Sequence, residues 1–212
     1  MRRRLILGGA IAVGTAALTY FLPLFHVVPL RGSGVEGSPA TDFDPAAFVE
    51  RFWIEQLIGS ATTAADASEL VGMLRDDPQA ARVKHGRSVG LGGVFYYFVA
   101  GTGRVVATEK NSVGLAVGDG EEAIEVELGT GPVFGNALRD GTGLLDVNDF
   151  PNSQNFNALS AELNKRVEDD VLPALRAVAV GATVRFAGCA EVVDEATDLR
   201  PLRVVPFLAE VR

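Results

Sequence analysis

The fold is decided by residues 94–109, VFYYFVAGTGRVVATE, which are predicted to form one long β-strand. Aromatic and β-branched side chains dominate this stretch, and both kinds are typical of strands. Gly101 and Gly103 interrupt it in the way that glycines mark a bend or a bulge. A first strand that is bent by glycines suits a five-stranded barrel of the OB type.

Four further strands are predicted after this stretch, over residues 112–119, 123–129, 182–193 and 202–212. Residues 157–179 lie between the third and fourth strands of the chain and are predicted to form a helix with an apolar stripe, which Pro173 should kink or divide. The sequence therefore predicts an α+β fold, with a five-strand OB-like β-barrel over residues 92–212 and one helix between strands 3 and 4. The alternative is a generic α+β sheet packed against helices.

A short helical segment, residues 44–86, precedes the strands. Its first helix is predicted to begin at Asp44-Pro45, because aspartate caps helices and proline is tolerated at the first helical position. Two more helices are predicted over residues 64–75 and 78–85. With the strands, this segment would complete a single domain over residues 44–212, since about 170 residues suffice for one well-buried core.

Residues 1–30 are predicted to form a signal anchor, which is an uncleaved transmembrane helix. Three arginines precede an uncharged run from Leu5 to Phe25, and about 20 apolar residues cross a bilayer as a helix. No convincing cleavage site closes this run, and a cleaved signal peptide is the alternative.

The orientation of this helix follows from the arginines, Arg2, Arg3 and Arg4, because positive charge stays on the cytoplasmic side. Residues 31–43 are rich in glycine, serine and proline, which predicts a flexible linker. The chain is therefore expected to be a single-pass protein of the cell membrane, with a cytoplasmic N-terminus and an extracytoplasmic domain over residues 44–212.

The charge of the exported part excludes some partners. The chain has 19 Lys and Arg against 27 Asp and Glu, and without the three N-terminal arginines the balance is 16 against 27, or −11. Nucleic-acid binding depends mainly on neutralising phosphates, so no nucleic-acid partner is expected. The same charge argues against a domain that lies on anionic lipid.

Motifs for familiar catalysis are missing from the sequence. It has no G-x-S-x-G motif, and its two histidines, His26 and His85, do not pair into a zinc motif. Cys189 is the only cysteine and is expected to be a small buried core residue. We therefore expect no catalytic residue, no metal and no cofactor.

Residues 135–152, GNALRDGTGLLDVNDFPN, form the motif that is richest in polar groups. It offers five candidate ligand-binding residues: Arg139, Asp140, Asp146, Asp149 and Asn152. Its spacing does not fit an EF-hand, because an apolar residue stands at the third ligand position and no glycine follows. In a purely structural interpretation, the arginine and its neighbouring aspartate tie the loop by charge-assisted hydrogen bonds to the backbone, while the other polar residues favour turns and helix caps.

Several segments together resemble one bacterial family: FDPAAFVERFW, VAGTGRV, GPVFGNALRD, LLDVNDFPNSQNFNALSAELN and a final P-x-L-x-E-V pattern. The family is one of predicted periplasmic lipoproteins of unknown function, whose genes often lie beside sugar ABC-transporter operons. The resemblance covers residues 43–212, but the acylated cysteine that the word lipoprotein implies is missing near the N-terminus. It implies an accessory role in solute uptake, with ABC-transporter components or a small sugar-like ligand as partners.

The sequence thus favours a membrane-anchored extracytoplasmic accessory or binding protein that is not an enzyme. One alternative is a carboxylate-dependent enzyme for a small polar substrate, using Asp140, Asp146 or Asp149. Another is a structural envelope protein whose OB-like face binds a further protein.

Overall fold

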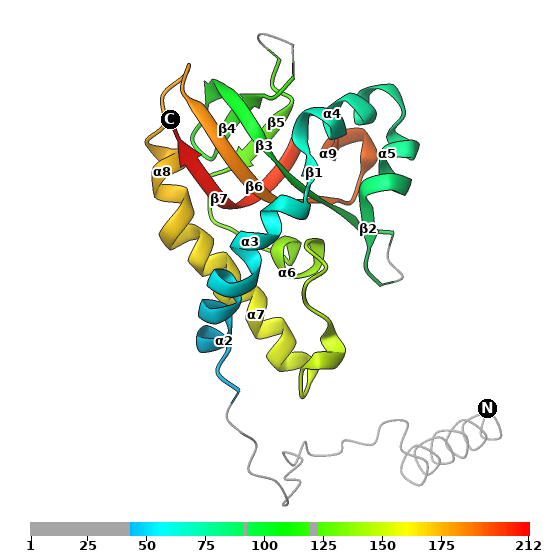
Figure 1. Ribbon diagram of the computed structural model, residues 1–212, viewed down its shortest axis with the longest axis vertical. Coiled ribbons are helices and arrows are strands. Elements are labelled where there is room, and N and C mark those ends of the chain that lie inside the picture. Colours follow the sequence, from blue (N-terminus) through cyan, green and yellow to red (C-terminus); the bar gives the residue numbers. More distant parts are fainter. Residues whose placement is uncertain (1–42, 91–92, 119–122) are drawn as a thin grey trace, which may run out of the picture. The chain divides into compact units, whose positions relative to one another are not determined.

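The computed structural model describes residues 43–90, 93–118 and 123–212 (Figure 1). The predicted anchor over residues 1–30 lies outside the described residues. Of the predicted linker, residues 31–43, only Phe43 is described. Residues Phe43–Arg212 form one compact unit. Within the described ranges, no helix is both long enough and apolar enough to cross a membrane.

The five predicted strands are all present, as β3 (Phe95–Thr108), β4 (Ser112–Ala116), β5 (Val126–Gly129), β6 (Thr183–Val192) and β7 (Leu202–Val211). Their pairings run in a ring, because β3 pairs with β4, β4 with β5, β5 with β7, β7 with β6, and β6 again with β3. The β5–β7 pair is parallel and the other four are antiparallel. The prediction of an α+β fold is confirmed.

The first strand of this ring uses its glycines for close packing. β3 pairs with β6 along residues 95–104 and with β4 from residue 104 onward, with a register shift between Val105 and Ala107. A Cβ at Gly101 would lie 2.6 Å from the Cβ of Ala67, and one at Gly103 would lie 2.9 Å from Val117 Cγ1. Both contacts are too short for any side chain, so these glycines admit a neighbouring helix and strand to β3.

Two short strands were not predicted, β1 (Ala65–Asp66) and β2 (Gly86–Ser88). Both pair with β3, β1 in parallel and β2 antiparallel. The N-terminal segment is therefore not purely helical but is hydrogen-bonded to the sheet at two places.

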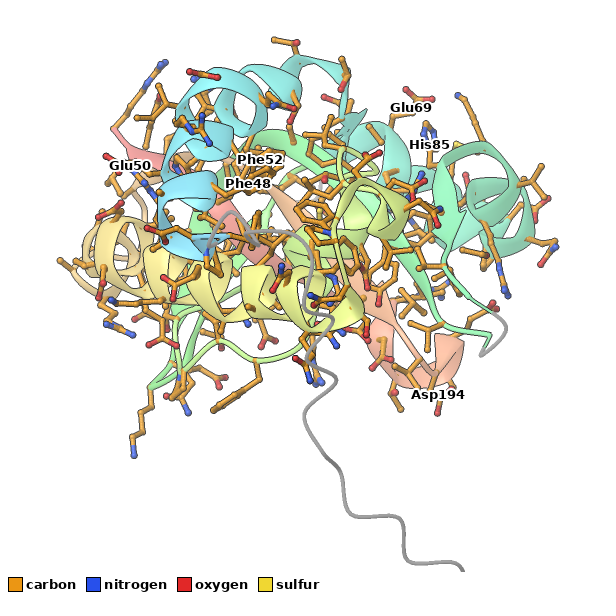
Figure 2. All side chains as sticks on the ribbon, turned by 90° about the horizontal axis from the view of Figure 1, so that it is seen from below. Phe48, Glu50, Phe52, Glu69, His85 and Asp194 are labelled. Carbon is orange, nitrogen blue, oxygen red and sulfur yellow. The ribbon has the colours of Figure 1, made fainter. Side chains whose placement is uncertain are left out.

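The helices of the N-terminal segment are α2 (Pro45–Phe52), the π-helical turn η1 (Trp53–Leu57), α3 (Ile58–Ser60), the 3₁₀ turn η2 (Ala61–Thr63), α4 (Ala67–Asp76) and α5 (Pro78–His85). Asp44 caps α2 and Asp77 caps α5, each followed by a proline at the start of the helix. Figure 2 shows Phe48 and Phe52 turned toward the centre of the unit and Glu50 turned outward. The predicted bounds of α5 are confirmed.

The connection between β5 and β6 is more broken than the single predicted helix. It contains α6 (Ala137–Gly141), the 3₁₀ turn η3 (Val147–Asp149), α7 (Ser153–Arg166), the π-helical turn η4 (Val167–Val171) and α8 (Leu172–Arg176). The helix predicted over residues 157–179 is present, but it begins four residues earlier, at Ser153, and ends at Arg176. Pro173 lies in the first turn of α8, where its missing N–H is tolerated, and the π-helical turn precedes it. The last helix, α9 (Glu195–Asp198), joins β6 to β7.

The hydrophobic core lies between the strand ring and two groups of helices. α2 and α7 run side by side at one end of the unit, whereas α4 and α5 lie at the other (Figure 1). The largest fully buried side chains come from the ring and from both groups: Tyr97, Phe52, Phe95, Phe186, Phe207, Leu57, Leu70, Leu74, Leu115, Leu128, Leu138 and Leu159. α6 packs against β3, β6 and α7, and so brings the polar motif onto the sheet.

Candidate functional site

Arg139 and Asp140 form a buried ion pair at the centre of the motif. Arg139 Nε donates to Asp140 Oδ1 at 2.7 Å, and Nη2 donates to Oδ2 at 2.9 Å. The two residues are only 7 % and 8 % exposed. Both carboxylate oxygens are therefore occupied by the two-pronged contact that guanidinium and carboxylate groups prefer.

The remaining contacts of the pair fasten α6 to its surroundings. Arg139 Nη1 donates to Asn157 Oδ1 on α7 at 2.8 Å, and the guanidinium carbon lies 4.3 Å from the centre of the Phe156 ring. Arg87 Nε, on β2, donates to the backbone oxygen of Asp140 at 3.1 Å. The ion pair therefore joins α6 to α7, and the backbone of Asp140 joins α6 to β2. The predicted charge-assisted hydrogen bonds to backbone are not what the structure shows for the pair, because the two side chains bind each other and the side chain of Asn157.

Two titratable groups of the sheet lie beside this ion pair. Burial raises the pKa of Tyr96 to about 12, and the carboxylates of Glu191 and Asp140 add to the effect. Burial also raises the pKa of Glu191, again with a contribution from the negative charge of Asp140. Cys189, on the same strand as Glu191, is fully buried, and burial raises the pKa of its thiol. Sequence reasoning singled out neither Tyr96 nor Glu191.

The other predicted ligand residues lie on the exposed part of the motif. Asp146 Oδ1 accepts hydrogen bonds from Asn148, from its backbone N–H at 2.8 Å and from its side-chain amide at 2.7 Å. Asn152 Oδ1 accepts from the backbone N–H of Asn155 at 2.8 Å and caps α7. These two residues are turn and cap residues, as the structural interpretation predicts.

Asp149 lines a hollow. It borders a pocket of about 410 Å³ whose walls are mostly apolar: Phe43, Phe48, Gln56, Leu144, Leu145, Phe150 and Pro151. The rings of Phe43, Phe48 and Phe150 are in mutual contact, with centroids 5.3–5.7 Å apart. Of the five predicted residues, the structure therefore pairs Arg139 with Asp140 and leaves the other three with separate neighbours.

A polar groove of about 450 Å³ lies beside the motif, between residues 133–136 and the α7–η4 helix. Three hydrogen bonds join its walls. Ser160 Oγ donates to Asn136 Oδ1 at 2.8 Å, Asn164 Nδ2 donates to the Gly135 oxygen at 3.0 Å, and the Val133 N–H donates to Glu168 Oε1 at 2.7 Å. The shape of the groove is therefore fixed by the protein itself.

The groove side chains keep hydrogen-bonding capacity after these contacts. Within the described part of the chain, Asn136 and Asn157 have their amide oxygens occupied and Asn164 has its amide nitrogen occupied, which leaves two amide donors and one amide acceptor. Lys165 adds a positive charge to the lining and Glu168 adds a negative one. Phe134 is 81 % exposed at the same groove. This surface combines an apolar ring with donors and acceptors held in place.

Sequence reasoning missed the groove, although a signal for it exists. Asn157, Ser160 and Asn164 are spaced by three and four residues, which places them on one face of a helix. That polar stripe differs from the apolar stripe by which the helix was predicted. The opposite wall, residues 133–136, is separated from that stripe by about 20 residues of sequence, most of them in the motif.

His85 lies away from the groove, at the end of α5, with its Nε2 3.8 Å from Glu69 Oε1; Figure 2 shows the two side chains next to each other. Among the described residues, no group of three or more His, Cys, Asp or Glu side chains is placed to hold a metal ion. The polar groove and the buried ion pair are therefore the features on which a function can be argued.

Comparisons with known proteins agree with this architecture. Residues 15–210 match the model of a family described as predicted periplasmic lipoprotein (DUF2291). The chain is also similar to an OB-fold protein from Thermotoga maritima whose crystal structure is known. That likeness has a TM-score of 0.70 and 27 % sequence identity, and it covers 80 % of this chain and 99 % of the other. No curated protein matches the chain.

Proposed function

Because the chain belongs to the family of predicted periplasmic lipoproteins (DUF2291), we propose that it is a membrane-associated extracytoplasmic protein that binds a small solute and catalyses no reaction. Residues 1–30 would serve as a single-pass anchor with a cytoplasmic N-terminus. The sole cysteine, Cys189, is buried in β6 and is unsuited to carry a lipid.

The observation that carries the binding role is that the Arg139–Asp140 ion pair is engaged within the protein, whereas the groove beside it keeps amide groups that make no further hydrogen bond within the described part of the chain. Arg139 donates hydrogen bonds from Nε, Nη1 and Nη2 to Asp140 and Asn157. The charges of this ion pair therefore stabilise the fold and are not available to a ligand. The groove beside them has fixed walls, free amide groups and an exposed aromatic ring. Small-molecule sites typically combine apolar surface with a few well-placed polar groups.

We infer a sugar-like molecule as the ligand of this surface. Hydroxyl groups both donate and accept hydrogen bonds, so they can use the amide N–H groups of Asn136 and Asn157 and the amide oxygen of Asn164. Phe134 offers an exposed ring against which the apolar face of a sugar can stack. Lys165 and Glu168 contribute opposite charges to the lining, which favours an uncharged ligand.

A role in sugar uptake is supported by the resemblance to a family whose genes often lie beside sugar ABC-transporter operons. We propose that the protein acts there as an accessory factor, with components of the transporter as its partners. The buried ion pair would then hold the groove in shape and would take no part in a reaction.

Thermal unfolding of the full-length protein in detergent, with and without D-glucose or D-ribose, tests this proposal. A ligand present at about 100 times its Kd stabilises a protein by about 2.7 kcal/mol, which raises Tm measurably. Phe134→Ala should reduce the ligand-induced shift while leaving the Tm without ligand close to that of the wild type, since the ring is 81 % exposed.

Val83→Ala is the matched control, because Val83 is also exposed, at 78 %, but lies on α5 outside the groove. It should keep the full shift. If neither D-glucose nor D-ribose raises the Tm of the wild type, the proposed ligand class is wrong. An equal shift in the wild type and Phe134→Ala would place the ligand elsewhere than in the groove.

A further inference from the structure

The pocket that Asp149 borders is a second hollow of the molecule, and it shares no lining residue with the polar groove. Its volume is about 410 Å³, and the rings of Phe43, Phe48 and Phe150 form its aromatic wall. Phe43 is the first described residue, Phe48 lies on α2, and Phe150 directly follows η3. We call this pocket the aromatic hollow, and the sugar site proposed above makes no use of it.

The three rings of the aromatic hollow are inclined to one another. The ring planes of Phe43 and Phe150 meet at 83°, those of Phe48 and Phe150 at 74°, and those of Phe43 and Phe48 at 46°. Three planes with these angles share no common direction, so no line of approach is edge-on to all three rings. The face of an aromatic ring carries partial negative charge, which attracts cations.

Further contacts hold the aromatic wall from behind. Phe48 stacks on Phe52 with centroids 6.1 Å apart, and Phe150 packs on Phe156 at 5.3 Å. The Arg139 guanidinium in turn lies 4.3 Å from the centre of the Phe156 ring. The same aromatic cluster therefore already contacts one cation on its inner side, and its rings are fixed by the fold.

Asp149 gives the aromatic hollow its charge. It is the one charged residue among the described residues that line the hollow. Within the described part of the chain, its carboxylate makes no hydrogen bond or ion pair, whereas the carboxylate of Asp146 is bound to Asn148. Gln56 of η1 adds an amide oxygen, which is a further acceptor. An unpaired carboxylate among aromatic rings is complementary to a cation with an apolar body.

The composition of the walls favours a quaternary ammonium group over a primary one. A primary ammonium has three N–H donors, which require acceptors when they leave water. Of the eight residues that line the hollow, only Gln56 and Asp149 have polar side chains. A quaternary ammonium has no N–H group, and its charge is spread over carbon substituents that pack against apolar and aromatic walls.

We propose that the aromatic hollow binds an organic cation with a quaternary ammonium group, which contacts the rings of Phe43, Phe48 and Phe150 and is neutralised by Asp149. The net charge of −8 draws cations toward the chain. The site is independent of the function proposed for the groove, because the two sets of lining residues are separate. A free amine and the headgroup of a lipid carry the same quaternary ammonium group, and the test distinguishes these two sources.

Isothermal titration calorimetry of the full-length protein in a non-ionic detergent, with choline chloride as the ligand, tests this proposal. Dimethylbutanol, the neutral alcohol in which carbon replaces the nitrogen of choline, should bind more weakly than choline. Equal affinity for the alcohol, or no binding of choline, would overturn the proposal. Glycerophosphocholine separates the sources: affinity equal to or above that of choline supports a lipid headgroup as the ligand, and lower affinity supports a free amine.

Two variants place the cation in the aromatic hollow. Asp149→Asn should raise the Kd of choline by about fivefold, which is the upper end for an exposed charge pair. Asp76→Asn makes the same change of charge at an exposed position on α4, outside the hollow, and should leave the Kd unchanged. Phe43→Leu keeps an apolar wall but removes one ring, so it should weaken the binding of choline more than that of dimethylbutanol.

A choline Kd that stays at the wild-type value in Asp149→Asn or in Phe43→Leu would overturn the proposal. Both variants should retain the sugar-induced rise in Tm, because neither residue lines the groove. Binding of choline without binding of D-glucose or D-ribose would contradict only the function proposed for the groove.

Discussion

The two halves of the polar motif have similar compositions and opposite roles. Residues 135–141 place Arg139 and Asp140 in the interior, where the two side chains bind each other and fasten α6 to α7 and β2. Residues 142–152 keep Asp146, Asp149 and Asn152 at the surface, where Asp146 and Asn152 accept hydrogen bonds from backbone N–H groups two and three residues away. The burial of a contact, and not the residue types in it, decides how much that contact contributes to the free energy of unfolding. The half that holds the buried charges is therefore the half that contributes most to the fold.

Arg139→Ala should have the largest effect on stability. The change leaves the carboxylate of Asp140 buried without its guanidinium partner, and removing one member of a buried ion pair costs about 3–5 kcal/mol. Arg139 also packs on Phe156 and binds Asn157, so further contacts are lost. Urea denaturation followed by circular dichroism measures the loss as a lower midpoint.

Arg185→Ala is the control for this prediction, because Arg185 pairs with Glu210 at 3.1 Å with both side chains nearly half exposed. Exposed pairs contribute about 0–1 kcal/mol, so this variant should unfold close to the wild type. Similar losses of stability in the two variants would mean that the buried ion pair contributes no more to the free energy of unfolding than the exposed pair does.

Gly141→Ala should have the next largest effect, because it disturbs the same buried half without touching a charge. A Cβ there would lie 2.8 Å from Cys189 Cβ and 2.9 Å from its Sγ, inside the contact distance of carbon and sulfur. Overpacking of this kind costs about 1–3 kcal/mol. The midpoint of chemical denaturation should fall by a corresponding amount.

Gly59→Ala supplies the comparison, since nothing lies within 4 Å of a Cβ at that position on α3. Alanine is favoured over glycine in helices by about 1 kcal/mol, so this variant should be as stable as the wild type or more so. If Gly141→Ala were equally harmless, α6 would not be packed as tightly on β6 as its geometry requires.

The difference between the two halves also explains which parts of the molecule could be predicted from sequence. The five strands of the ring were predictable because each carries its own run of aromatic and β-branched residues, and α5 because Asp77, Pro78 and Gly86 mark its two ends. Such signals are local. The turn and cap roles of Asp146 and Asn152 were predictable for the same reason, since their partners are two and three residues away.

Features that depend on distant partners were not predictable. α6 has only five residues, too few for a helical pattern, and it is held in place by contacts with β3, β6 and α7. β1 and β2 have two and three residues and are strands only because β3 lies beside them. The groove depends on how α7 and residues 133–136 come together, and no local pattern records that approach.

Asn152→Ala should have the smallest effect of the three and tests the exposed half of the motif. The change removes the acceptor for the Asn155 N–H at the start of α7, and loss of such a cap typically costs about 1 kcal/mol. Asn152→Asp keeps an acceptor at the same place and should retain most of the stability, because aspartate caps helices about as well as asparagine. Asp146→Ala should cost less than Asn152→Ala, since the turn that Asp146 caps has only three residues, none of them buried. If Asn152→Ala lowered stability as much as Arg139→Ala, the exposed half would stabilise the fold as strongly as the buried half. The two halves would then differ in the kinds of contact they make but not in their contribution to the free energy of unfolding.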